Sequence, residues 1–213
     1  MCAAQPREWI LLGDARLRRT PRQQKRRALG GSTRTIIMGY YVRAFCTSSQ
    51  VPELQETQTW LQKRGSVALI DEPNHAVEQA RAQIASTPII NLGSSDWEQV
   101  AVTYKRGKLP ILAECNREDG SEDSLLHEEL AEFVELIEEA EPSAARQRVL
   151  DHLGKTKFIV ACQVPTSDVD DDGYNATGDF LTFFAERCGG LIRADREGFY
   201  EGSTLVLPLD GAA

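Results

Sequence analysis

The sequence predicts an α+β fold (an α/β sandwich), in which helices pack on a mixed sheet. Short aromatic and β-branched runs alternate with stretches of helical periodicity, as in strands that are joined by helices. Other apolar runs are separated only by short glycine-containing turns, which predicts hairpins and therefore antiparallel pairs. The charge distribution further indicates that this folded part begins near Met38.

The net charge of the chain changes sign at Met38. Residues 1–37 carry nine Lys or Arg and two acids, a net charge of +7, whereas residues 38–213 carry 15 basic and 30 acidic residues, a net charge of −15. The first segment has too few apolar side chains to offset the entropy of ordering it, so we expect a disordered basic arm. Its interpretation stays open between a nucleic-acid-binding or targeting arm, a transit peptide, and a mis-called start with translation beginning at Met38. Residues 38–213 suit a single acidic α+β domain.

Apolar patterning and turn residues define the first half of this domain. Pro52 suits the first turn of a helix, and Gly65 suits its end. Alternation around a Lys-Arg-Gly-Lys turn predicts a hairpin. The expected elements are, in order, a strand at 40–45, a helix from Pro52 to Gly65, a strand at 67–70, a helix at 75–85, and hairpin strands at 97–104 and 109–115.

The second half contains the strongest helical signal of the chain. Between residues 122 and 140, apolar residues recur at the i, i+3/i+4, i+7 spacing of one buried stripe. Glycines at 154 and 189 suit the ends of two further helices. The expected elements are, in order, helices at 122–140 and 143–153, a strand at 158–164, a helix at 177–188, and strands at 191–194, 199–200 and 204–207.

Two segments of the chain resemble each other. Residues 60–71 and 184–195 align without gaps, with Gly65 on Gly189 and Asp71 on Asp195. Either the chain contains a duplication, or both segments follow the general preference for glycine between a helix and a buried strand. Both interpretations suggest two ferredoxin-like βαβ halves, with parallel pairs between strands that a helix connects.

Cysteine content and hydropathy indicate a soluble protein of a reducing compartment. The five cysteines are an odd number at irregular spacings without a C-x-x-C motif, so we expect free thiols and a cytoplasmic location. No apolar run approaches the roughly 20 residues of a membrane span. We therefore expect no membrane partner. The negative charge of the domain also disfavours nucleic acid as its partner, except for the basic arm.

Residues 168–179 contain the sharpest local motif. Asp168, Asp170, Asp172 and Asp179 occupy alternate and terminal positions around Gly173, which resembles the calcium loop of the EF-hand. The segment departs from that pattern because a strand precedes it, Asn175 replaces an aliphatic residue, and Asp179 replaces the longer glutamate. The resemblance implies that these four carboxylates bind Ca²⁺. The alternative is an acidic surface loop in which Asn175 or Thr177 caps the following helix.

A second acidic feature lies along the predicted helix at 122–140. Residues 118–141 contain eleven acids and no Lys or Arg. Seven of these acids lie on or beside the helix face opposite the apolar stripe, among them Glu128, Glu132, Glu135 and Glu139. This pattern predicts a docking surface for a basic protein partner, because complementary charge accelerates encounter. The alternative is an ordinary solvated helix face.

Catalytic motifs are missing from the sequence. His75, His127 and His152 form no H-x-x-H or H-E-x-x-H motif, and no G-x-S-x-G or phosphate-binding glycine motif occurs. Cys46 follows a strand and is either a nucleophile or a buried structural thiol. The leading hypothesis is therefore a non-enzymatic protein-binding module of the adaptor or inhibitor kind. The alternatives are a calcium-binding module and an enzyme of unknown reaction, for which we predict no catalytic or cofactor-binding residues.

Overall fold

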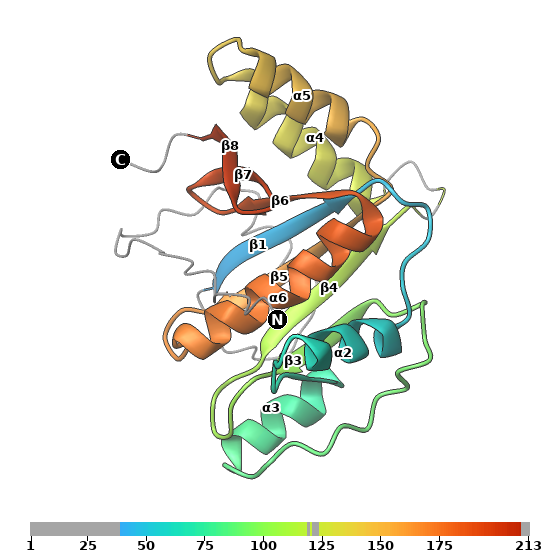
Figure 1. The fold of residues 1–213 in the computed structure, drawn as a ribbon, viewed down its shortest axis with the longest axis vertical. Coiled ribbons are helices and arrows are strands. Elements are labelled where there is room, and N and C mark those ends of the chain that lie inside the picture. The colour runs from blue at the N-terminus through green and yellow to red at the C-terminus, as the bar shows by residue number, and fades with distance from the viewer. Residues whose placement is uncertain (1–38, 119, 121–123, 210–213) are drawn as a thin grey trace, which may run out of the picture. The chain divides into compact units, whose positions relative to one another are not determined.

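A computed structural model describes residues 39–118, 120 and 124–209 of the chain (Figure 1). These residues form eight strands and five helices, which confirms the predicted α+β class. The basic arm, residues 1–37, lies outside the described residues. In chain order, the elements are β1 (Gly39–Cys46), α2 (Leu54–Lys63), β2 (Leu69–Asp71), α3 (Pro73–Arg81), β3 (Gln99–Thr103), β4 (Ile111–Arg117), α4 (Leu125–Glu138), α5 (Ala144–Leu153), β5 (Phe158–Pro165), α6 (Asp171–Cys188), β6 (Gly190–Ala194), β7 (Gly198–Glu201) and β8 (Thr204–Pro208).

The strands form one sheet in the order β2-β3-β4-β5-β1-β6-β7-β8, and every pairing among them is antiparallel. This corrects the mixed sheet that we predicted. The connections through α2 and α6 do join strands of the same direction, but antiparallel strands lie between them. β1 separates β5 from β6, and β3, β4 and β5 separate β1 from β2. The connections through α2 and α6 thus have the predicted strand direction but not the predicted adjacency, whereas α3 and the pair α4–α5 connect antiparallel neighbours.

The two predicted βαβ halves occupy different positions in the sheet. β5, α6 and β6 with β1 between the strands form a split βαβ unit of the ferredoxin-like kind. The first half differs, because β2 lies at the edge of the sheet while β6 lies beside the central strand β1. Both segments, residues 60–71 and 184–195, end a helix in the same way. Gly65 and Gly189 have φ angles of 80° and 61°, which glycine adopts with little strain.

Alternation along the strands divides the core between the two faces of the sheet. In β1, Ala44 and Cys46 face a core that includes Phe180 and Phe184 of α6 together with residues of α2. Phe45 faces the opposite side, where it meets residues of α4 and α5. The two layers of helices therefore cover different faces of one sheet. None of the helices in the described ranges is long and apolar enough to cross a membrane.

The largest difference from the predicted boundaries is at the start of α6. The helix begins at Asp171, six residues before the predicted start at residue 177. Asp170 is its N-cap, and the carboxylate of Asp170 accepts a hydrogen bond from the amide of Gly173 at 3.3 Å. An aspartate at this position stabilises a helix by satisfying a free amide. The capping residue is therefore an aspartate of the acidic motif and not Asn175 or Thr177.

A buried glutamine covers the outer edge of β2. The side-chain oxygen of Gln58 accepts a hydrogen bond from the Ile70 amide, and its nitrogen donates to the Ala68 carbonyl, both at 2.9 Å. The side chain of Gln58 thus satisfies backbone groups that a neighbouring strand would otherwise bind. Open strand edges promote association with other chains.

We expect Gln58→Leu to lower the free energy of unfolding by about 1–3 kcal/mol, because it leaves these two backbone groups without partners in a buried position. Urea denaturation measures the loss. Gln62→Leu, on the exposed side of α2, is the control and should change stability by less than about 0.5 kcal/mol. An equal effect of both substitutions would contradict the role of Gln58.

Candidate functional site

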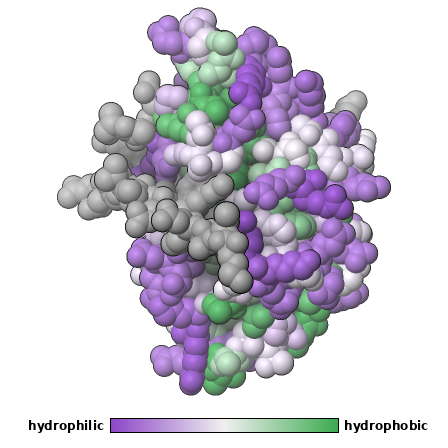
Figure 2. All heavy atoms as spheres, in the orientation of Figure 1, coloured by the Kyte–Doolittle hydropathy of each residue, from purple (hydrophilic) through white to green (hydrophobic). Residues whose placement is uncertain are grey.

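The glutamates predicted to bind a partner lie on one exposed stripe of α4. Glu128, Glu132, Glu135 and Glu139 are all exposed, and we call them the acidic face. Their spacing of four, three and four residues keeps them on one side of the helix. The opposite side is buried, with Leu126, Phe133 and Ile137 in the core. Figure 2 shows the face of the molecule seen in Figure 1, on which hydrophilic residues dominate and apolar residues form small separate patches.

Three members of the acidic face are unpaired. Within the described residues, Glu132, Glu135 and Glu139 make no hydrogen bond or ion pair. The last turn of α4 contains no basic residue, and Glu135, Glu138 and Glu139 lie near its C-terminal end. Negative charge is unfavourable there because it adds to the negative end of the helix dipole. The acidic face therefore lowers the stability of its own helix.

Glu129 belongs to the same helix but points toward the sheet. Its side chain is 12% exposed, and its carboxylate binds the guanidinium of Arg43 at 2.8 Å and the amide of Asn116 at 2.9 Å. Arg43 also binds Asp195 at 2.9 Å. Burial lowers the pKa of Arg43, but the charges of Asp195 and Glu129 outweigh burial and raise it. Glu129 is thus a structural acid that sequence periodicity grouped with the exposed ones.

The acidic motif forms the N-terminus of α6 and binds lysines of the β3–β4 turn. Asp170 and Asp172 bind the ammonium group of Lys105 at 3.0 and 2.9 Å. Asp168 accepts a hydrogen bond from the Leu109 amide at 2.7 Å and forms an ion pair with Lys108 at 3.4 Å. The hydrogen bond from Lys105 lowers the pKa of Asp170. These three aspartates therefore attach the hairpin turn to α6.

Asp179, the fourth predicted calcium ligand, is separated from the other three. It lies within α6, eight residues after the helix begins, and its carboxylate is 3.5 Å from the guanidinium of Arg64. Burial raises the pKa of Asp179 despite this arginine. Ca²⁺ requires six to eight converging oxygens, and no three Asp, Glu, His or Cys side chains of the described part of the chain are grouped to hold a metal ion. Calcium binding stays a prediction, and the described geometry supplies no preformed site for it.

Asp71 forms a polar cluster that the sequence did not indicate. Its buried carboxylate accepts hydrogen bonds from the amides of Glu72 and Ile89 at 2.8 and 2.9 Å and from the Ser86 hydroxyl at 3.0 Å. The fourth partner is Nδ1 of His75 at 2.6 Å. Burial alone would raise the pKa of Asp71, but these hydrogen bonds lower it. The cluster attaches the segment after α3 to the end of β2.

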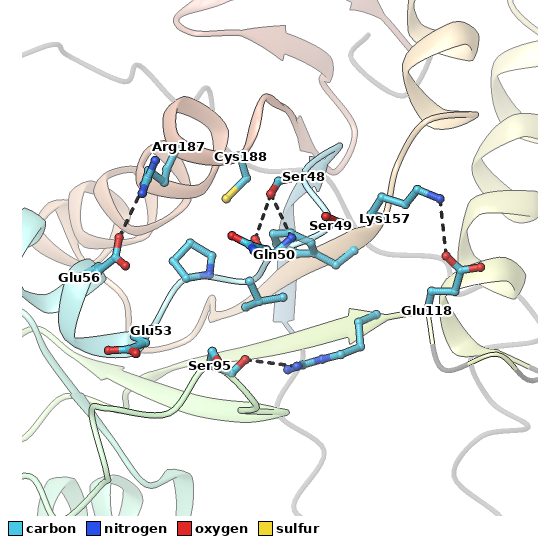
Figure 3. Close-up of a pocket in the computed structure, with 14 residues that line it drawn as sticks. Ser48, Ser49, Gln50, Glu53, Glu56, Ser95, Glu118, Lys157, Arg187 and Cys188 are labelled. Atoms are coloured by element: carbon cyan, nitrogen blue, oxygen red, sulfur yellow. Dashed lines mark hydrogen bonds and ion pairs between the residues drawn. The ribbon is translucent and has the colours of Figure 1, made fainter.

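A pocket of about 790 Å³ opens where β1, β4 and α6 end and where α2 and β5 begin (Figure 3). Three basic residues line it, each with a partner. Lys157 lies 3.6 Å from Glu118, Arg187 lies 3.6 Å from Glu56, and Arg117 binds Asp96 at 2.9 Å. Its wall also contains Ser48, Ser49, Gln50, Ser95 and Cys188. Sequence analysis missed this pocket because its residues come from five separate segments.

His152 and Cys46 contact only structural groups in the described residues. Nε2 of His152 lies 2.8 Å from the Phe45 carbonyl oxygen, and burial lowers the pKa of this histidine. Cys46 is fully buried in the core.

Of the predicted site residues, the structure brings together the four glutamates of the acidic face and three of the four aspartates of the acidic motif. Comparison of the chain with protein-family models, curated proteins and solved structures finds no match.

Proposed function

We propose that this protein is a non-enzymatic binding module that recognises a basic protein through the acidic face of α4. The observation that carries the proposal is the absence of any partner for Glu132, Glu135 and Glu139 among the described residues. Elsewhere, the aspartates at 168, 170, 172 and 179 are all paired with Lys or Arg. Exposed acids without a partner in the described residues also occur singly on other elements, such as Glu78, Glu98 and Glu186, whereas the acidic face gathers three of them on one side of a single helix.

The electrostatic cost of the acidic face supports a functional origin. Like charges at i, i+3 and i+4 destabilise a helix by a few tenths of a kcal/mol per pair, and acids near its C-terminus add to that cost. Departures from local stability are expected at functional sites. A basic partner would remove both unfavourable terms and would be attracted from a distance. The same charge would repel the phosphates of nucleic acids.

The four cysteines of the described residues support a cytoplasmic location. All four are free and buried, as expected where thiols remain reduced. A cytoplasmic adaptor or inhibitor agrees with this chemistry and with the predicted absence of a membrane partner.

Charge reversal on α4 tests the proposal. We expect Glu132→Lys, Glu135→Lys and Glu139→Lys together to lower affinity for a basic partner about tenfold or more, because attraction becomes repulsion. Full-length wild type and variant are immobilised, and the proteins that each retains from lysate at low salt are quantified by mass spectrometry. Carbodiimide cross-linking of the complexes should join these glutamates to lysines of the retained partner.

A matched variant separates the acidic face from net charge. Glu78→Lys, Glu98→Lys and Glu186→Lys change the charge equally at other exposed positions and should leave binding intact. The α4 variant should also be at least as stable as wild type, since it removes acids from the C-terminal end of a helix. Equal loss of binding in both variants, retained proteins without basic character, or cross-links elsewhere would refute the proposal.

A further inference from the structure

Two thiols meet at the wall of the pocket. Cys188 ends α6 and lines the pocket, and Figure 3 shows its sulfur among the lining side chains. Cys46 ends β1 and lies behind the wall in the core. The exposed fractions of Cys188 and Cys46 are 4% and 0%. The first thiol is therefore accessible only through the pocket, and the second is fully enclosed.

Backbone contacts fix the two cysteines beside each other. Cys46 is paired with Gly190 in the sheet, two residues after Cys188. The amides of Thr47 and Ser48 both donate to the Cys188 carbonyl oxygen at 3.1 Å. The distance between the Cys46 sulfur and the carbonyl oxygen of Phe184, one helical turn before Cys188, is 3.8 Å. These contacts hold the end of β1 against the last turn of α6.

The pKa values of the two thiols are shifted in opposite directions. The neighbouring Cys46 thiol lowers the pKa of Cys188, and the positive charge of Arg187 lowers it further. Burial and Glu56 act in the other direction without reversing the shift. Burial and the neighbouring Cys188 raise the pKa of Cys46. Cys188 is thus the thiol that ionises more readily, and Cys46 remains protonated.

We propose that Cys188 and Cys46 form a redox pair that a hydroperoxide entering the pocket oxidises to an intramolecular disulfide. The Cys188 thiolate attacks one oxygen of the hydroperoxide, the O–O bond breaks, and the departing alkoxide takes a proton to become an alcohol. Cys188 becomes a sulfenic acid. Lys157 and Arg187 line the same pocket, each beside a glutamate, and their N–H groups are donors that favour departure of the alkoxide.

Cys46 then completes the reaction. Its sulfur attacks the sulfenic sulfur of Cys188, an S–S bond forms, the S–O bond breaks, and hydroxide leaves as water with the proton of Cys46. The two thiols together lose two electrons, and the hydroperoxide is reduced to alcohol and water. A dithiol reductant restores both thiols by exchange. The disulfide would covalently join β1 to α6 at the pocket wall.

Peroxide titration of the reduced full-length protein tests the pair. After one molar equivalent of hydrogen peroxide, free thiols are blocked with N-ethylmaleimide and the protein is mapped without reduction. We expect a Cys46–Cys188 peptide, three of the five cysteines still alkylated, and full reversal by dithiothreitol. Cys188→Ser should abolish the oxidation.

Two further variants separate the roles of the thiols. Cys46→Ser should stop the reaction at a sulfenic acid on Cys188, which dimedone traps, so this variant remains decisive if Cys188→Ser fails to fold. Cys162→Ser is the control and should leave the disulfide unchanged, because Cys162 lies in the sheet core, where burial raises its pKa. Oxidation confined to Cys2, disulfides between molecules, or five unmodified thiols would overturn the proposal.

Discussion

Replacing Glu129 by alanine is expected to lower the free energy of unfolding by about 3–5 kcal/mol, the usual cost of removing one member of a buried ion pair. The side chain of Arg43 is 10% exposed and binds Glu129 and Asp195. Without Glu129, Arg43 keeps one of its two carboxylate partners, and Asn116 loses a hydrogen-bond acceptor. Urea denaturation of the wild type and the variant measures the difference.

Two comparisons make this prediction specific. Glu132→Ala removes an exposed and unpaired acid from the same helix, so stability should change by less than about 0.5 kcal/mol. Adding Arg43→Met to Glu129→Ala should recover part of the loss, because it removes the incompletely compensated buried charge. If Glu129→Ala and Glu132→Ala have the same effect, the division of α4 into structural and docking acids is wrong.

The second large effect is expected at Asp71. Asp71→Ala should lower the free energy of unfolding by about 3 kcal/mol, because it removes a fully buried carboxylate that is the acceptor for several part-buried donors. The affected donors are the Ile89 amide, the Ser86 hydroxyl and the His75 ring. Asp151→Ala is the control, since the Asp151 carboxylate is exposed and, among the residues that the structure describes, binds only Gln147, at 2.8 Å. Equal stability losses would contradict the role of the cluster.

The contribution of Asp71 should also depend on pH. Its pKa is lowered in the folded state, so its stabilisation is complete above the unfolded-state value of about 4 and is lost as the pH falls below that value. The stability gap between wild type and Asp71→Asn should therefore narrow between about pH 5 and pH 2. Denaturation curves across this range measure the gap, and a constant gap would contradict the assignment.

Local patterns in the sequence predicted secondary structure well where one side of an element is buried. The stripe of apolar residues placed α4 within three residues of its observed start, and glycine correctly marked the ends of α2, α5 and α6. Strand pairing was not predictable in this way, because some helical connections join strands of the same direction with other strands between them, while others, such as α3, join antiparallel neighbours. Asp170 was predicted only as a metal ligand, with Asn175 or Thr177 as the cap, and the structure shows Asp170 as the cap. Aspartate suits both roles, so its presence in the sequence does not distinguish them.

The candidate site likewise contains features that local spacing predicts and features that depend on long-range contacts. Helical spacing was enough to place Glu128, Glu132, Glu135 and Glu139 on one exposed stripe. The burial of Glu129 was not predictable, since its partner Arg43 is 86 positions away. The thiol pair depends on the register of β1 against β6, which sets Cys46 opposite Gly190. Long-range pairings of this kind leave no periodic trace in a single sequence.

The central position of β1 has a consequence for synthesis on the ribosome. β1 is the first described strand to be translated, yet both of its neighbours, β5 and β6, emerge more than a hundred residues later. At about 5–20 residues per second, both edges of this strand stay unpaired in the nascent chain for roughly 5–20 s. We therefore expect the sheet to assemble late in translation, and a chaperone that shields β1 during this interval should raise the yield of folded protein.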